Sequence, residues 1–221
     1  MRYGFQFRDV LAAWELFVEG LLVTLTLSVA AFAGGLALGV LGAAIRTYGP
    51  GWAKFLVSSY VAVVRNTPLL VQLFVIFFGL PALGIRLDSM TAAIIALIFN
   101  LGAYTVEIVR AGFESIPEGQ LEAGRALGLS GPQIFRHVVL FQSMRSMVPA
   151  LSSQFIFFML GTAAVSQIAV TDLFHTASLV QSRTFRDFEV YIVIAGIYLV
   201  LAQVMRLVFA GGYRLAFGGR S

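Results

Sequence analysis

Five polar side chains that could bind a solute lie within or beside long apolar segments: Arg65, Thr67, Gln72, Asn100 and Tyr104. Charged and hydrogen-bonding groups are costly in hydrocarbon unless they face a partner or a water-filled cavity. We therefore predict that these side chains surround a central cavity on a solute pathway. Alternatively, Arg65 lies at the headgroup level, and Thr67 and Gln72 satisfy a carbonyl group that Pro68 leaves free.

Two further pairs of polar residues follow in the later apolar segments. Glu107 and Arg110 are spaced i,i+3, which favours a structural ion pair over a role in the cavity. Thr162 and Ser166 lie one turn apart on a shared helix face and are candidates for the pathway. The alternative for both hydroxyl groups is a hydrogen bond to the backbone of their own helix or to a neighbouring helix.

The sequence offers no site for catalysis or for a metal. It has no cysteine, and His137 and His175 have no metal-ligating partners at a useful spacing. Lys54 is the single lysine, and no G-x-x-x-x-G-K-[ST] phosphate loop is present. We expect neither enzymatic activity nor a cofactor in this chain. The arginines are dispersed between apolar segments, which argues against nucleic acid as a partner.

The composition indicates a membrane protein. Of the 221 residues 59% are hydrophobic and only 12% are charged, where soluble domains carry about a quarter charged residues. Because about 20 apolar residues cross the hydrocarbon core, we predict an all-α protein with five transmembrane helices in one domain over residues 1–221. The segments that carry them are 20–45, 66–85, 89–106, 146–171 and 190–205.

With the N-terminus outside and the C-terminus in the cytoplasm, ten of the 15 lysines and arginines lie on the cytoplasmic side and five outside. This distribution follows the positive-inside rule. The first predicted helix also carries a stripe of small residues, namely Ala31, Gly35, Gly39 and Gly42 or Ala43. Such a stripe lets helices approach closely in lipid. We expect packing within the subunit, with a contact between subunits as the alternative.

The segment 112–145, between the third and fourth predicted spans, is polar but keeps helical spacing. Pro117 suits a first helical position, Gly128 suits a helix end, and Ser130 precedes a proline. We predict a short surface helix, a tight turn and a second amphipathic segment. Since this chain lacks a nucleotide site, such a helix could receive force from an ATP-hydrolysing partner. The alternative is an ordinary connection between two spans.

Within this segment the sequence resembles the permeases of ATP-binding-cassette (ABC) importers. Their motif E-A-A, three residues, G, nine residues, I-x-L-P is matched by Glu122-Ala123-Gly124, Gly128 and Val138-Val139-Leu140-Phe141. Gly119-Gln120-Leu121-Glu122-Ala123 is similar to G-Q-x-E-A of the polar amino acid (His/Gln/Glu/Arg-type) branch. The segments 65–72, 104–112, 142–149 and 182–191 are similar to further motifs of this branch, in the same order.

The resemblance implies a permease of the bacterial inner membrane. It implies that Gly119, Glu122, Ala123, Gly124 and Gly128 couple the chain to a dimer of ABC ATPases, which binds the ATP. It also implies a second permease subunit, identical or related, and an extracytoplasmic solute-binding protein that delivers a polar amino acid. Which amino acid is transported stays open, and a non-transporting scaffold or sensor subunit is the alternative function.

The fourth predicted helix departs from the branch. Where its members have K-D-T-S-L, this chain has Leu160-Gly161-Thr162-Ala163-Ala164. The missing lysine and aspartate are charges suited to an amino acid's carboxylate and ammonium groups. Either a partner subunit binds the solute, or this chain recognises a less polar one.

Overall fold

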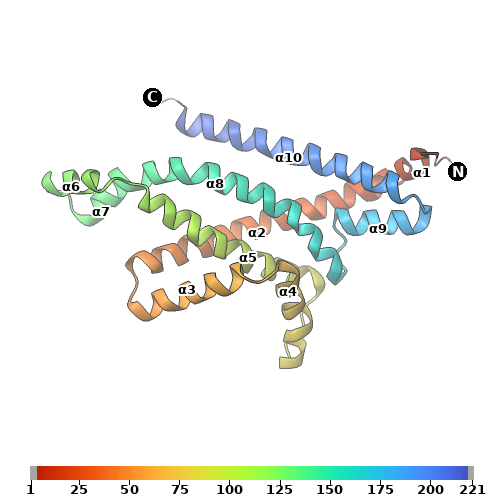
Figure 1. Cartoon of the computed structure of the whole chain (residues 1–221), viewed down its shortest axis with the longest axis horizontal. Helices are drawn as coiled ribbons and strands as arrows, with labels where there is room; N and C mark the ends of the chain where they lie inside the picture. Colours follow the sequence, from red (N-terminus) through yellow and green to blue (C-terminus); the bar gives the residue numbers. More distant parts are fainter. Residues whose placement is uncertain (1–3, 219–221) are drawn as a thin grey trace.

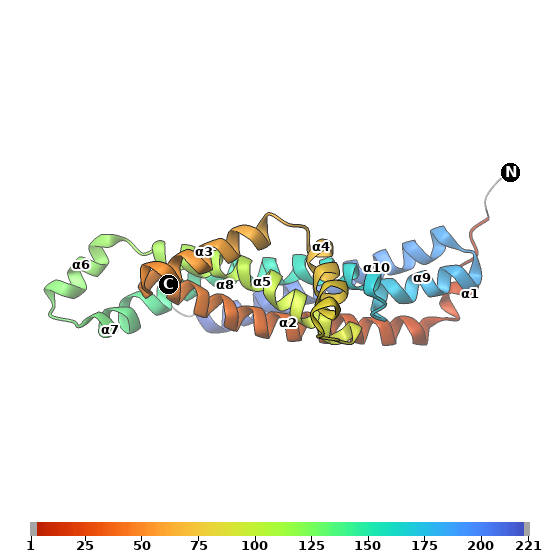
Figure 2. The same ribbon diagram turned by 90° about the horizontal axis from the view of Figure 1, so that it is seen from below.

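The computed structural model describes residues 4–218, and these are helical without a β-strand (Figure 1). The elements are α1 (Phe7–Leu11), α2 (Trp14–Tyr48), α3 (Gly51–Arg65), α4 (Leu69–Phe74), η1 (Val75–Gly79), η2 (Leu80–Leu83), α5 (Ser89–Glu114), α6 (Glu118–Ala126), α7 (Gly131–Ile134), η3 (Phe135–Val139), α8 (Leu140–Gly161), η4 (Thr162–Ile168), α9 (Leu173–Thr184) and α10 (Asp187–Phe217). The long helices form an elongated bundle, with α6 and α7 at one end and α1 and α9 at the other (Figures 1 and 2).

Four helical segments are long and apolar enough to cross a membrane. They are α2, α5, the continuous segment Gly131–Ile168 and α10. A fifth candidate is the pair Gly51–Arg65 and Leu69–Leu83, whose two parts are bent by 108°. The predicted all-α membrane fold is therefore confirmed. The number of candidate spans is four, or five if the bent pair counts as one span. The predicted second span, 66–85, coincides with the second part of this bent pair, and α3 forms the first part.

The bend between α3 and α4 is centred on Asn66, Thr67 and Pro68. Pro68 has no backbone N–H group and precedes α4 with an extended ψ of 140°. The helix therefore ends at Arg65 and restarts at Leu69 in a new direction. The side chain of Asn66 donates to the carbonyl oxygen of Ala62 at 2.8 Å, and the same oxygen accepts from the backbone N–H of Asn66 at 3.2 Å.

The small-residue stripe of α2 faces α5, so the predicted packing within the subunit is confirmed. A Cβ atom added at Gly35 would lie 2.9 Å from the side chain of Leu101, and one added at Gly39 would overlap the side chain of Thr105. Gly42 lies in the same way against Val106. Because these glycines have no side chain, the backbones of α2 and α5 lie close together over much of their length.

The segment after α5 has the predicted form of a short helix, a turn and a second helix. Gly128 has a φ of +76°, and Ser130 and Gln133 form a capping box at the start of α7. Ile134 packs against Gly124, which fixes α6 on α7. Two details differ from the prediction. Pro117 precedes the first helix instead of beginning it, and the second helix continues without a break into α8.

At the opposite end, α9 is anchored to α2 by a buried polar contact. The side chain of Asp172 caps α9 by accepting from the backbone N–H of His175 at 2.9 Å, and Thr24 accepts from Leu173 N at 3.1 Å. Burial raises the pKa of Asp172 to about 6, although the hydrogen bond to His175 N opposes this shift. The short helix between two spans is thus held to the bundle.

We predict that Gly39→Leu destabilises the fold by about 1–3 kcal/mol or more, because the new side chain must displace Thr105. The midpoint of thermal unfolding of the purified protein measures the effect. Gly211→Leu is the matched control, since a Cβ atom at this α10 position meets no atom within 4 Å. Equal midpoints for the two variants would show that the contact between α2 and α5 does not limit stability.

Candidate functional site

A cavity of about 640 Å³ lies at the bend between α3 and α4, with α5 and α8 forming its other walls. Four of the five predicted side chains line it, namely Arg65, Thr67, Asn100 and Tyr104. Gln154 and Phe157 of α8 also line the cavity and were not expected from the sequence. Residue type alone did not place Gln154 and Phe157 at the cavity, because tertiary packing decides which face of α8 borders it.

Gln72, the fifth predicted residue, does not line the cavity but joins the bend to α5. Its Nε2 atom donates to the carbonyl oxygen of Val64 and to Oγ1 of Thr67, both at 2.8 Å. Its Oε1 atom accepts from Nδ2 of Asn100 at 3.0 Å. Val64 is the residue whose carbonyl group an N–H at Pro68 would satisfy in an uninterrupted helix. A polar side chain, that of Gln72, therefore satisfies this carbonyl group, as the alternative prediction for Thr67 and Gln72 stated.

Arg65 stands where two adjoining cavities meet. Its guanidinium carbon lies 5.4 Å from the centre of the Tyr104 ring, which is a cation–π geometry. Arg65 and Tyr104 also line a second cavity of about 470 Å³, together with Arg46 and Glu107. Arg65 therefore lines both cavities, and a position at the headgroup level stays the alternative. A role in solute passage stays a prediction.

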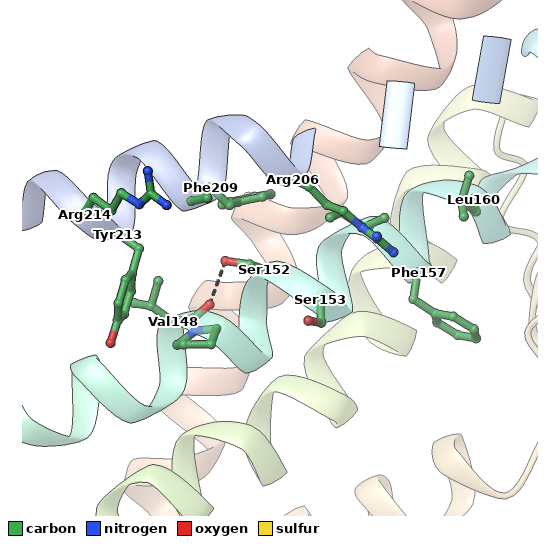
Figure 3. Close-up of a pocket in the computed structure, with 12 residues that line it drawn as sticks. Val148, Ser152, Ser153, Phe157, Leu160, Arg206, Phe209, Tyr213 and Arg214 are labelled. Atoms are coloured by element: carbon green, nitrogen blue, oxygen red, sulfur yellow. Dashed lines mark hydrogen bonds between the residues drawn. The ribbon is translucent and has the colours of Figure 1, made fainter. Parts of the chain in front are cut away.

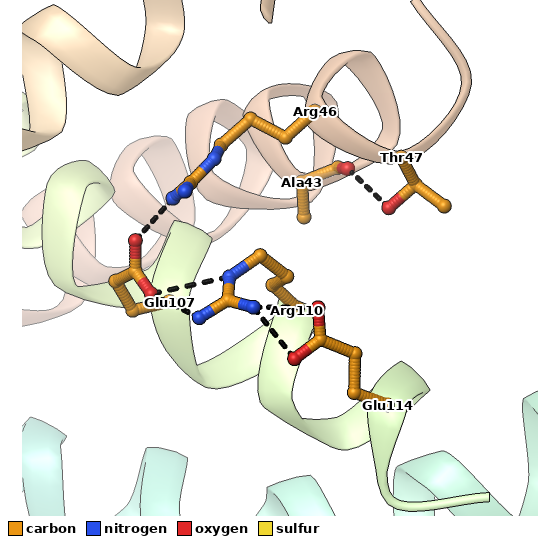
Figure 4. Close-up of polar contacts among 6 residues, drawn as sticks. All are labelled: Ala43, Arg46, Thr47, Glu107, Arg110 and Glu114. Atoms are coloured by element: carbon orange, nitrogen blue, oxygen red, sulfur yellow. Dashed lines mark hydrogen bonds and ion pairs between the residues drawn. The ribbon is translucent and has the colours of Figure 1, made fainter.

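Four charged residues form a chain that links α2 to α5 (Figure 4). The predicted pair is present, with Nη2 of Arg110 lying 2.9 Å from Oε2 of Glu107. Arg46 of α2 forms an ion pair with the other oxygen of Glu107, and Arg110 also binds Glu114 at 2.5 Å. The i,i+4 spacing of Arg110 and Glu114 could have been found in the sequence. The partner Arg46, 61 residues away, could not.

Thr162 and Ser166 lie in η4 and neither lines the cavity. Thr162 is fully buried, and its hydroxyl group donates to the carbonyl oxygen of Met159 at 2.7 Å. Ser166 donates to the carbonyl oxygen of Ala163 at 2.8 Å. Both thus make the backbone hydrogen bonds that were the alternative. Gly161 and Ala164 line the cavity in this part of the chain, and a pathway role for the two hydroxyl groups stays a prediction.

The residues expected to couple to an ATPase lie together on α6 and the turn after it. Gly119, Glu122, Ala123 and Gly128 are exposed, whereas Gly124 is buried against Ile134. This helix projects from one end of the bundle (Figure 2). It therefore presents an accessible polar surface, while its buried glycine sets the contact to α7. Among residues 4–218 no group of three or more His, Cys, Asp or Glu could hold a metal ion.

An all-helical fold with several candidate spans and a polar cavity beside a broken helix is an architecture found among membrane transport proteins. Residues 35–210 match the family described as "Binding-protein-dependent transport system inner membrane component". The chain belongs to this family, whose members are transport permeases and leave ATP hydrolysis to a partner ATPase.

Curated relatives and solved structures agree with this assignment. The chain is 36% identical to the glutamine transport system permease protein GlnP of Escherichia coli strain K12, over 92% of this chain and 94% of GlnP. It is 37% identical to the L-cystine transport system permease protein TcyB of Bacillus subtilis strain 168, over 88% and 84%. A crystal structure of an amino acid ABC transporter with histidines has a TM-score of 0.91 at 36% identity, covering 96% of this chain and 99% of that chain.

We predict that Glu107→Gln lowers stability by about 1–3 kcal/mol, because Arg46 and Arg110 lose their shared carboxylate in a partly buried position. The free energy of unfolding of the purified protein measures the loss. Glu114→Gln serves as the control, since its side chain is 62% exposed and the same change there should cost less than about 1 kcal/mol. A loss at Glu114 as large as that at Glu107 would contradict a central role for Glu107.

Proposed function

We propose that this chain is the permease subunit of an ATP-driven importer for polar amino acids in the bacterial inner membrane. The observation that carries the proposal is the polar cavity at the break between α3 and α4, lined by Arg65, Asn100 and Tyr104. Guanidinium, amide and phenol groups suit a small polar solute. The relatives named for glutamine and L-cystine transport, and the octopine transport permease OccM of Rhizobium meliloti, support this substrate class.

In this proposal the bent pair counts as one span, which gives five transmembrane helices. The N-terminus lies outside and the C-terminus in the cytoplasm, as the distribution of lysine and arginine favours. The solute pathway is then lined by Arg65, Thr67, Asn100 and Tyr104. Gln72 positions two of these residues through its hydrogen bonds to Thr67 and Asn100. Two such subunits, identical or related, form the pore, and an extracytoplasmic binding protein delivers the solute.

The helix α6 is the proposed contact for the ATPases, which bind the ATP. It is exposed, it begins shortly after α5 ends, and the turn after it leads into the long segment Gly131–Ile168. A displacement of α6 would therefore act on α5 and α8, which are two of the helices that border the cavity. Closure of an ATPase dimer on ATP would change access to the cavity in this way. The scaffold or sensor function draws no support from the relatives, which are transport permeases.

The direct test is reconstitution of the chain into vesicles with its ATPase, its second permease subunit and its binding protein. We expect ATP-dependent uptake of labelled L-glutamine or another polar amino acid. A complex that assembles and hydrolyses ATP but imports none of the amino acids offered would favour the scaffold or sensor function.

We further predict that Glu122→Arg lowers uptake about tenfold or more while ATP hydrolysis continues, because the reversed charge disrupts the α6 surface without entering a core. Uptake and ATPase rates of the same vesicles measure the coupling. Glu15→Arg is the control, since Glu15 is an exposed acid near the start of α2, far from α6 in the fold. Unchanged uptake in Glu122→Arg would remove α6 as the coupling element.

A further inference from the structure

A carboxyl group with an unpaired oxygen is buried where α9 packs on α2 and α10. Asp172 is fully buried. Its Oδ1 atom accepts from the backbone N–H of His175 at 2.9 Å, whereas Oδ2 has no hydrogen-bond partner among residues 4–218. A buried carboxylate needs donors on both oxygens to offset the loss of water. The surroundings of Asp172 therefore suit the neutral carboxylic acid better than the carboxylate.

A second unpaired polar atom lies near this carboxyl group, on α10. Within the described part of the chain, only Oδ2 of Asp172 and the hydroxyl oxygen of Tyr198 are buried side-chain atoms without a hydrogen bond. Tyr198 is within electrostatic reach of Asp172 and lies next to Thr24 of α2. Hydroxyl groups elsewhere find acceptors, as Ser152 does on the carbonyl oxygen of Val148 at 2.7 Å (Figure 3). The two unpaired atoms thus belong to one polar cluster between α2, α9 and α10.

The charges near Asp172 do not offset its burial. Burial raises the pKa of Asp172 to about 6, although the backbone N–H group and the charge of His175 act in the opposite sense. Among the described residues no base forms an ion pair with Asp172. The segment η4 has no titratable residue. The other titratable side chains at this end of the bundle are Arg8, Asp9, Glu15, Glu19, Arg183, Arg186, Asp187, Glu189, Tyr191 and Tyr198.

We propose that Asp172 is a buried proton-binding site, and that a proton on its Oδ2 atom fixes α9 on α2 and α10. The proton comes from water and converts the carboxylate into the neutral acid, while Oδ1 keeps its hydrogen bond from His175 N. When the proton leaves, the carboxylate gains free energy by reaching water, so α9 loosens. With the N-terminus outside, as proposed above, the site responds to extracytoplasmic pH.

The place of α9 in the chain lets this site act on the cavity at the bend. Only residues 169–172 separate η4 from α9, and Ala164 of η4 lines the cavity. Ala169 in this connection has a φ of +62°, a conformation that few residues other than glycine adopt. The connection is therefore short and constrained, and a change in the docking of α9 would act on the cavity wall. The inference holds whichever solute is transported.

The pH dependence follows from the difference between the docked and released forms. A solvated aspartate has a pKa of about 3.9, whereas docking raises the pKa of Asp172 to about 6. The docked form thus keeps a proton that the released form gives up between about pH 4 and 6. The preference for docking is greatest below about pH 4 and is lost as the pH rises through about 6. From about pH 5 to about pH 7.5 the equilibrium constant for release should rise about tenfold.

The test is hydrogen exchange of the α9 backbone amides in the full chain, held in lipid nanodiscs and corrected for the intrinsic effect of pH. We expect about tenfold less protection at about pH 7.5 than at about pH 5. Asp172→Asn should remove this pH dependence, because the amide stays neutral and its oxygen can still accept from His175 N. Infrared spectra of the wild type should show a carboxylic acid C=O band at about pH 5 that fades by about pH 7.5 and is missing from Asp172→Asn.

Asp88→Asn is the matched control. Asp88 also caps a helix, since it accepts from the backbone N–H of Thr91 at 3.0 Å, but it is exposed. The hydrogen bonds from Thr91 hold the pKa of Asp88 below its usual value, so this carboxylate stays ionised over the same pH range. The pH dependence of α9 in Asp88→Asn should therefore equal that of the wild type.

Three results would overturn the proposal. They are equal protection of α9 in the wild type at the two pH values, a wild-type spectrum without the carboxylic acid band, and a pH dependence that persists in Asp172→Asn. The last result, if His175→Gln then removed the pH dependence, would assign it to His175, because histidine titrates in the same range. A positive charge in the first turn of α9 would weaken the helix at low pH, which is the opposite of the expected direction.

Discussion

Helices α2 and α5 touch along a face on which α2 presents Gly35, Gly39 and Gly42 to the side chains of α5. In lipid, where apolar surface gains little from leaving the hydrocarbon, such close backbone packing is a main source of helix association. The contact brings Arg46 within reach of Glu107. It also fixes the rotation of α5, so that Asn100 and Tyr104 face the bend between α3 and α4. The position of the cavity wall therefore depends on the three glycines of α2, which let α5 approach closely.

The break at Pro68 shows how an interrupted helix is tolerated inside a membrane protein. Ending α3 and restarting α4 leaves carbonyl groups without partners, and in hydrocarbon each would be costly. Gln72 supplies one of the missing donors by binding Val64, and Asn100 then holds Gln72 from α5. Of these two amide side chains, Asn100 also lines the cavity, whereas Gln72 lies outside its lining. The hydrogen bonds that close the backbone network therefore also hold Asn100 in place at the cavity wall.

The charges divide into those with partners and those without. Glu107 and Glu114 are satisfied by Arg46 and Arg110, and this chain of ion pairs ties the α6 end of α5 to α2. Arg65 rests on the ring of Tyr104 and lines the cavity at the bend. The ion pairs thus hold α5 against α2, while the guanidinium group of Arg65 lies at the cavity beside them.

The sequence by itself determined the membrane class, the family, the helix and turn around Gly128, the ion pair of Glu107 with Arg110, and four residues of the cavity. Each of these features follows from local composition, from spacings of three or four residues, or from a motif of fixed length. Only the tertiary structure decided that α3 precedes the bend, that Arg46 completes the ion pair, that Thr162 is buried, and that Arg206 shares a groove with Leu160. The physical reason is that hydropathy reports the transfer of a segment into lipid but not which face of one helix meets another. That choice depends on side-chain packing between residues far apart in the chain.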